Sequence, residues 1–375
     1  MISAKFVCEL LKNNGTDFFC GVPDSLLKDF CAYVTENFDK KKNIITANEG
    51  NAIALAVGHY LATSNPALVY MQNSGTGNTI NPLLSLADEE VYNVPLLIFV
   101  GWRGEPDKKD EPQHIKQGKV TDDIFDACKI EHSVLSDDEK SAEIEILKAF
   151  DYMQKTLKPY VFVIKKGTFE KYEKKKSPNK FEMSRETAIS TVMNFVDEKS
   201  VIVSTTGQIS RELYEIREKS GQPHNADFLT VGSMGHASSI ALGIALEKPD
   251  KAVFCFDGDG AFLMHMGAIP VIAEQSPQNF KHVLFNNEAH DSVGAQKTSA
   301  NVVNFKDLAI SCGYKNAFSV EKLDDLKNIM PEFLTAESPS LLEIKVNCGA
   351  RADLGRPKEK PVQNKIAFME KLNAN

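Results

Sequence analysis

Two polar segments that each follow an apolar run are the best candidates for chemistry in this chain. Asp259 follows the run 252–256, and Asn287 follows the run 282–285. Their side chains offer a carboxylate and an amide oxygen, and the backbone carbonyl of Ala289 is placed to add a third oxygen. Mg²⁺ prefers such hard oxygen donors and usually keeps phosphate oxygens among its ligands. The spacing therefore predicts a magnesium site at two neighbouring strand ends.

The turn around Asp259 also has the features of a phosphate site. Gly258 and Gly260 flank the carboxylate, and a helix is expected to open at Ala261. Glycine lets the backbone approach a ligand closely, and the N–H groups at a helix start favour anions. We therefore expect a diphosphate that is held partly through the metal.

Composition limits the class of protein. The chain has 375 residues, 42% hydrophobic and 25% charged, which is typical of a globular protein with room for two domains. A net charge of −8 provides no basic face for nucleic acid. No apolar run approaches the ~20 residues of a membrane helix, and the N-terminus lacks a signal-peptide pattern. Seven cysteines without a C-x-x-C pair indicate reduced core thiols, so we expect a cytoplasmic protein with neither nucleic-acid nor membrane partners.

Near-continuous apolar strands alternate with helical patterns in both halves of the chain, which predicts parallel sheets covered on both faces. The expected strands are 18–20, 67–71, 95–100, 160–164, 201–204, 228–231, 252–256, 282–285, 317–320 and 341–346. A charged stretch with Pro178, residues 171–180, is the expected linker. The fold class is therefore α/β, with two doubly wound, mainly parallel domains over 1–170 and 181–375.

A carboxylate in the first half is expected to be buried. Glu49 opens a helix that is otherwise rich in Ala, Ile and Leu. A glutamate at a helix start is commonly just favourable with the helix dipole. In a buried helix, however, the carboxylate needs a partner, and desolvation would raise its affinity for a proton.

Three further turns each follow an expected strand and open a helix, and the turn 204–210 is a natural place for a diphosphate because of its backbone N–H groups. They are 73–78 with Gly75 and Thr76, 204–210 with Gly207 and Gln208, and 230–237 with Gly232, Ser233 and Met234.

In this order, the segments resemble the thiamine diphosphate (ThDP) enzymes. The resemblance implies ThDP and Mg²⁺ as cofactors, with Asp259, Asn287 and Ala289 as the metal ligands. It also implies that Glu49 is the catalytic carboxylate that contacts the pyrimidine nitrogen N1′. Met234 would be the apolar side chain that packs under the cofactor and holds it bent, as a wedge. The cofactor-binding residues that it implies are Gly75, Thr76, Gly207, Gln208, Gly232, Ser233, Met234, Gly258, Asp259, Gly260, Ala261 and Asn287. One departure is Ala261, where the superfamily often has a hydroxyl side chain, so backbone N–H groups would carry more of the diphosphate.

The absence of a middle domain makes the chain similar to the compact 2-oxo acid decarboxylases that act on phosphonopyruvate or sulfopyruvate. The segments that carry this likeness are 21–28, 101–106, 110–114 and 286–294. The likeness implies nonoxidative decarboxylation of 3-phosphonopyruvate to phosphonoacetaldehyde and CO₂, in phosphonate (2-aminoethylphosphonate) biosynthesis. Sulfopyruvate decarboxylation, which gives sulfoacetaldehyde, is the alternative. It further implies a homodimer or larger homo-oligomer with the active site at the subunit interface.

A dianionic substrate needs local cations in a chain whose net charge is −8. The candidates for substrate binding are Ser25, Arg103 and Lys108, and the further catalytic candidates are Asp24, as a proton relay, His114 and His290.

Two functions from other classes remain open on the residues alone. A ThDP-fold subunit without catalysis would be marked by loss of Glu49 or of the metal residues, and all of these are present. A nucleotide-binding protein that uses Gly75 or Gly258 as a phosphate loop would need a Gly-Lys-Ser/Thr or Gly-x-Gly-x-x-Gly pattern, and neither occurs here.

Overall fold

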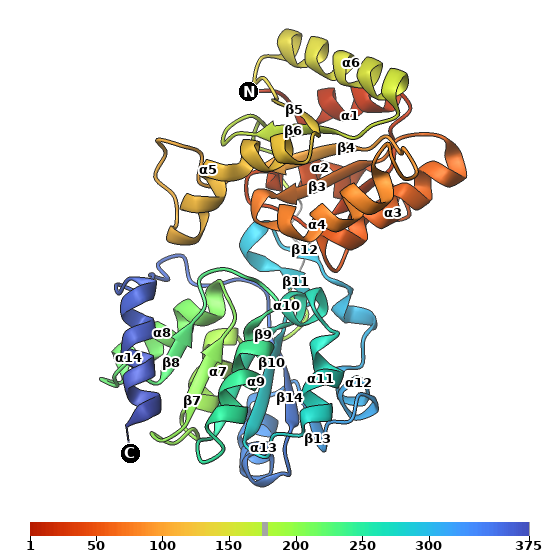
Figure 1. Cartoon of the computed structure of the whole chain (residues 1–375). Helices are drawn as coiled ribbons and strands as arrows, with labels where there is room; N and C mark the ends of the chain where they lie inside the picture. The colour runs from red at the N-terminus through yellow and green to blue at the C-terminus, as the bar shows by residue number, and fades with distance from the viewer. Residues whose placement is uncertain (175–178, 375) are drawn as a thin grey trace. The chain divides into compact units, whose positions relative to one another are not determined.

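The chain folds into two compact α/β units in a computed structural model that describes residues 1–174 and 179–374 (Figure 1). Unit 1 comprises Met1–Lys176 and Val293–Gln296, and unit 2 comprises Ser177–Ser292 and Lys297–Asn375. The predicted linker, 171–180, includes residues 175–178, which lie outside the described residues. The domain limits drawn from the sequence therefore stay a prediction.

Unit 1 is built on a parallel sheet with the strand order β2-β1-β3-β4-β6-β5. Its strands are β1 (Phe19–Gly21), β2 (Asn43–Ile45), β3 (Leu68–Gln72), β4 (Leu97–Gly101), β5 (Glu131–Val134) and β6 (Tyr160–Ile164). Its helices are α1 (Ala4–Asn13), α2 (Lys28–Asn37), α3 (Glu49–Thr63), α4 (Thr76–Pro82), α5 (Pro112–Ala127) and α6 (Glu139–Thr156).

Unit 2 has a second parallel sheet with the order β8-β7-β9-β10-β14-β13. The strands are β7 (Val201–Ser204), β8 (Asp227–Leu229), β9 (Val253–Gly258), β10 (Phe280–Asn286), β13 (Asn316–Val320) and β14 (Ser340–Lys345), and the chain after β10 adds β11 (Ala289–His290) and β12 (Gln296–Lys297). The helices are α7 (Arg185–Met193), α8 (Gln208–Lys219), α9 (Ala237–Glu247), α10 (Asp259–Met264), α11 (Ala268–Gln275), α12 (Phe305–Ser311), α13 (Leu323–Thr335) and α14 (Pro361–Asn373).

The two sheets repeat one winding order. In each unit the second strand lies on one side of the first, and the third and fourth lie on the other side. The chain thus reverses direction beside β1 and β3 in unit 1, and beside β7 and β9 in unit 2. Doubly wound sheets bind ligands at this reversal, outside the carboxyl ends of the strands.

Each sheet is covered on both faces, because successive strand residues point to opposite sides. In unit 1, Phe99 packs with helices α1, α2 and α6, whereas its neighbour Ile98 packs with α3 and α5. In unit 2, Phe256 packs with α7, α8 and α13, and Cys255 packs with α9 and α12. The predicted fold class, two doubly wound parallel domains, is confirmed.

Two strands of unit 1 were not expected from the sequence. β2 is three residues long and only half-buried, and β5 begins with an exposed Glu131. Both lie at sheet edges, where one side of the strand has no partner strand and the apolar run that marks an inner strand is missing. No helix in the described parts of the chain has the length and apolarity needed to span a membrane.

The fold predicts opposite effects for two glycine-to-alanine changes in unit 1. A Cβ at Gly118 in α5 would lie 1.7 Å from the Gly104 carbonyl oxygen, whereas nothing lies within 4 Å of a Cβ at Gly58 in α3. Gly118→Ala should destabilise the protein by roughly 1–3 kcal/mol through overpacking. Gly58→Ala should stabilise it by roughly 0.5–1 kcal/mol, because alanine loses less backbone entropy in a helix. Thermal unfolding of both variants checks this, and equal melting shifts would contradict the described packing of α5.

Candidate active site

The predicted metal residues lie together at the carboxyl ends of β9 and β10. Asp259 is the first residue of α10 and is 2% exposed, and Asn287 directly follows β10 and is also buried. The Asn287 N–H contributes a backbone hydrogen bond to the Asp259 carboxylate, and the Asn287 Oδ1 accepts from the Ala289 N–H at 3.0 Å. The structure thus brings Asp259, Asn287 and Ala289 into one cluster.

The electrostatics of this cluster fit a hard divalent cation. Burial raises the pKa of Asp259 to about 7, although hydrogen bonds from Thr298 and three backbone N–H groups act in the opposite direction. A carboxylate so far from water needs a proton or a cation to compensate its charge. The donors beside it are oxygens, which Mg²⁺ prefers. Thr298, whose hydroxyl donates to Asp259 Oδ2, was missed from the sequence because it lies 39 residues further along the chain without a motif.

The predicted wedge residue lies beside the metal turn. A Cβ at Gly260 would lie 2.9 Å from Cε1 of His290 and 3.3 Å from the Met234 methyl group. Gly260, Met234 and His290 are therefore neighbours, as the predicted roles require. Burial lowers the pKa of His290 to about 4, so the imidazole is neutral at physiological pH. In the loop before Met234, Ser233 has a left-handed backbone with φ of 52°.

The predicted diphosphate loop follows β7. Gly207 precedes α8 with φ of +100°, a conformation that favours glycine, and Gln208 is the first residue of the helix. The Gln208 side chain accepts a hydrogen bond from Arg185 at 2.5 Å, so it is already engaged. What Gln208 can offer a diphosphate is therefore its backbone N–H at the helix start.

The predicted catalytic carboxylate lies in unit 1. Glu49 is the first residue of α3, is 5% exposed, and accepts a hydrogen bond from Asn78 at 2.7 Å. A Cβ at Gly75 would lie 2.3 Å from Glu49 Oε1, so only glycine fits there. The hydroxyl of Thr76 is buried and has no hydrogen-bond partner among the described residues. Glu49, Gly75 and Thr76 thus form a buried polar cluster with a free donor, which suits a polar heterocycle.

A second buried carboxylate lies where three strands of unit 1 end. Asp24 is fully buried after β1 and accepts hydrogen bonds from Gln72 Nε2 at 2.5 Å and the Leu26 N–H at 2.8 Å. It packs against Gly101, the last residue of β4. Burial raises the pKa of Asp24, against the opposing effect of Gln72 and the Arg103 charge. A carboxyl group whose pKa is raised is better suited to donate a proton than an exposed one, as a proton relay must.

Arg103 lies near Asp24 but is already paired. Its guanidinium binds Asp110 through both Nε and Nη2, with Nε 2.8 Å from Oδ2, and its Nη1 donates to the Ser25 hydroxyl at 3.0 Å. Asp110 also accepts from the Gly104 N–H at 2.7 Å. The structure therefore joins Arg103 with Ser25, while Lys108 is exposed on the same loop.

His114 is buried in α5, and burial lowers its pKa. Its Nδ1 lies 3.3 Å from the Gln117 side-chain oxygen. The partners Gln72, Asn78 and Asp110 were not predicted. Sequence signals existed for Asn78, which lies within the glycine-rich turn 73–78, and for Asp110, which opens the segment 110–114.

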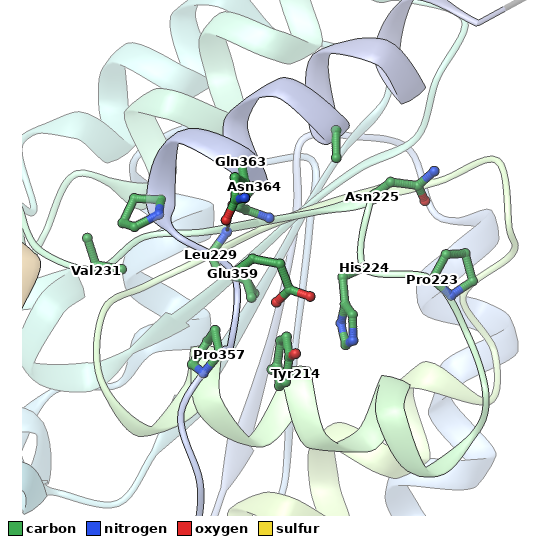
Figure 2. A pocket seen from close by; sticks show the side chains of 12 residues that line it. Tyr214, Pro223, His224, Asn225, Leu229, Val231, Pro357, Glu359, Gln363 and Asn364 are labelled. Atoms are coloured by element: carbon green, nitrogen blue, oxygen red, sulfur yellow. Dashed lines mark hydrogen bonds between the residues drawn. The ribbon is translucent and has the colours of Figure 1, made fainter.

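A separate hollow in unit 2 has a volume of about 260 Å³ (Figure 2). Its walls include the stacked rings of Tyr214 and His224, 4.0 Å apart, and Glu359 from the segment before α14. No predicted cofactor, metal or substrate residue lines it.

Comparison with known proteins places both units in one superfamily. The family described as thiamine pyrophosphate enzyme, N-terminal TPP binding domain, matches residues 1–127, and the corresponding C-terminal TPP binding domain matches residues 205–344. A phosphonopyruvate decarboxylase of Streptomyces hygroscopicus is 32% identical and aligns over 99% of this chain and 94% of its own length.

Two further relatives agree. A phosphonopyruvate decarboxylase of Streptomyces viridochromogenes is 31% identical over 97% of this chain and 93% of its own length. A sulfopyruvate decarboxylase of Methanosarcina acetivorans is 28% identical over 90% of this chain and 89% of its own length.

The buried Asp259 predicts a distinctive stability profile without metal. The pKa of the Asp259 carboxyl group is about 7 in the folded protein, whereas the usual value for an aspartate is 3.8. The folded state therefore binds this proton more tightly than the unfolded state does. Metal-free protein should therefore lose stability as pH rises from about 4 to 7. Asp259→Asn removes the ionisable group and should be roughly 1–3 kcal/mol more stable than wild type at pH 7.5 in EDTA.

Urea unfolding at pH 5 and pH 7.5, with EDTA or with Mg²⁺, measures this profile. At pH 7.5, Mg²⁺ should restore the free energy of unfolding that the wild-type protein loses in EDTA. The free energy of unfolding of Asp259→Asn should be the same with Mg²⁺ and with EDTA. Parallel pH profiles for the two proteins would contradict the assignment of Asp259 as the buried metal-binding carboxylate.

Proposed function

Because the chain belongs to the phosphonopyruvate decarboxylase family of thiamine pyrophosphate enzymes, we propose that it decarboxylates 3-phosphonopyruvate to phosphonoacetaldehyde and CO₂ without oxidation. The observation that carries the proposal is the 32% identity to such an enzyme over 99% of the chain. The product would enter phosphonate biosynthesis, and we place the protein in the cytoplasm.

The residues that would hold the cofactors are those whose oxygen atoms can bind a metal ion or whose N–H groups can bind a phosphate. Asp259, Asn287 and the Ala289 carbonyl would bind Mg²⁺, and the backbone after Gly207 and Gly258 would receive the diphosphate. Glu49, Gly75, Thr76, Gly232, Ser233 and Met234 would surround the rings. When bound, ThDP supplies a carbon nucleophile and an electron sink for the loss of CO₂.

Glu49 would move the proton that activates the cofactor. Its carboxylate is buried and held by the Asn78 amide at 2.7 Å, so it can present one oxygen in a fixed direction. A carboxylate that is held within reach of a ring nitrogen can exchange a proton with it.

Asp24 and Arg103 would act on the substrate. Asp24, fully buried, would hold the proton that is delivered after CO₂ leaves. Arg103, oriented by Asp110, would bind the phosphonate together with the Ser25 hydroxyl. Burial lowers the pKa of both His114, which is buried, and His290, which is half-buried, and both imidazoles would add hydrogen bonds to the substrate.

We also infer a homodimer or larger homo-oligomer with a shared active site. The residues proposed for the pyrimidine belong to unit 1, and those proposed for the metal belong to unit 2. Two subunits would then supply one carboxylate each to every site, Glu49 from one and Asp259 from the other.

Aldehyde release from two substrates tests the proposed function. With ThDP and Mg²⁺, the protein should turn over phosphonopyruvate at least ~100-fold better in kcat/KM than sulfopyruvate, because a dianionic phosphonate gains more from a guanidinium than a monoanionic sulfonate does. A preference for sulfopyruvate would replace the proposed substrate with the alternative. No turnover of either acid would refute the decarboxylase proposal.

Glu49→Gln tests the proton transfer. The amide keeps the size of the side chain but cannot take up a proton, so turnover should fall ~10²- to 10⁴-fold while ThDP affinity changes little. Exchange of the C2 proton of bound ThDP, followed by NMR, should slow by a similar factor. Exchange at the wild-type rate would leave Glu49 only as the first residue of α3.

Arg103→Ala tests the phosphonate contact. Loss of a charge-assisted hydrogen bond should cost roughly 2–4 kcal/mol, or about 30- to 1000-fold in kcat/KM for phosphonopyruvate. The loss should be smaller for pyruvate, which has no phosphonate. Lys109→Ala, on the same loop but exposed, is the matched control. Equal losses on both substrates would assign Arg103 to the carboxylate or to the scaffold.

A further inference from the structure

Three side chains with metal-binding chemistry meet inside the core of unit 2. Cys255 and His282 are register partners on the adjacent parallel strands β9 and β10 (Figure 1). Asp257 is two residues beyond Cys255 on β9, so its side chain points to the same face of the sheet. Cys255 and His282 are 0% exposed, and Asp257 is 1% exposed. A carboxylate and an imidazole are costly to bury unless they are paired, whereas a thiol is often buried.

The pairing within this trio is incomplete. His282 Nε2 is 3.5 Å from Asp257 Oδ2 and makes no hydrogen bond. That separation is beyond the usual N–H···O range. The other ring nitrogen, Nδ1, lies 3.2 Å from the Tyr314 hydroxyl. In the tautomer that carries its proton on Nδ1, this nitrogen donates to the Tyr314 hydroxyl. Nε2 then has a free lone pair, which can bind a metal ion.

A tetrahedral metal ion accounts for this spacing. Zinc bonds of 2.0–2.3 Å to nitrogen, oxygen and sulfur place neighbouring ligand atoms about 3.3–3.7 Å apart. The 3.5 Å between His282 Nε2 and Asp257 Oδ2 has this length. All three ligand atoms lie within 4.8 Å of one another, so the Cys255 sulfur needs to approach by about 1 Å at most.

The charges and the outer contacts agree with zinc. A Zn²⁺ ion, a thiolate, a carboxylate and a neutral imidazole sum to zero, which suits a site without water. A thiolate with an imidazole selects zinc over Mg²⁺ or Ca²⁺. A histidine ligand commonly has its second ring nitrogen held by an outer partner, and Tyr314 is in that position.

We propose that Cys255, Asp257 and His282 bind a structural Zn²⁺ ion. Asp257 Oδ2 would be a direct ligand, and Oδ1, which also accepts a hydrogen bond from the Gly258 N–H at 2.9 Å, would complete four-coordination through its second lone pair. On binding, the thiol releases its proton to solvent and sulfur donates its electron pair to the metal. The ion would join β9 to β10 immediately before the turns that carry Asp259 and Asn287. It would thereby fix the distance between the two predicted magnesium ligands.

Metal analysis of the purified holoenzyme tests the proposal. Wild type should contain roughly one zinc per chain, and Cys255→Ser and His282→Gln should retain less than about a tenth of it. Cys20→Ser is the matched control, because Cys20 is equally buried on β1 of unit 1. That variant and Asp259→Asn should both keep the zinc.

A second readout applies if the core variants fold poorly. Protein produced with Co²⁺ should show thiolate-to-cobalt charge-transfer bands and tetrahedral d–d bands in wild type and in Cys20→Ser. Wild type without stoichiometric zinc and without these cobalt bands would overturn the proposal, and the trio would then be a buried Asp–His ion pair. Full zinc content in a folded Cys255→Ser variant would overturn it as well.

Discussion

A carboxylate that is buried away from water must find hydrogen-bond donors, a proton or a cation, and this constraint organises the candidate site. Asp24, Glu49 and Asp259 are each at most 5% exposed and follow strand ends or open helices. Their surroundings differ, and so do their chemical uses. Burial raises the pKa of Asp24 against the opposing effect of the Gln72 hydrogen bond, Asn78 holds Glu49, and oxygen donors around Asp259 favour a cation. In the roles that we propose, the same physical cost would serve a proton relay, an activating group and a metal ligand.

The features that depend on residues close together in the chain were predicted well from the sequence. Inner strands are apolar runs bounded by polar turns, so the parallel sheets and their two layers of helices could be derived from the pattern. Asp259 and Asn287 directly follow such runs, and parallel strands bring their carboxyl ends to one edge. Glu49 was found because it is the single charge at the start of an apolar helix. These positions need no knowledge of side-chain partners.

What depends on partners distant in the chain could not be predicted. The Asp110 carboxylate pairs with the Arg103 guanidinium and holds it in one position, so Arg103 is not a free cation. No rule of sequence spacing predicts this pairing. Thr298 reaches Asp259 from a loop without a motif. The trio of Cys255, Asp257 and His282 depends on the register between β9 and β10, which only the structure supplies. The edge strands β2 and β5 lack the apolar run that a buried strand requires.

The central claim is that Glu49 and Asp259 serve one active site that is assembled from two subunits. The most direct measurement is the activity of mixed, inactive Glu49→Gln and Asp259→Asn proteins after subunit exchange has been verified by mass. A hybrid dimer contains one site with both carboxylates intact, so a random mixture should recover up to about a quarter of wild-type activity. Recovery at this level is the predicted result. No recovery in a mixture with confirmed hybrids would contradict the shared site.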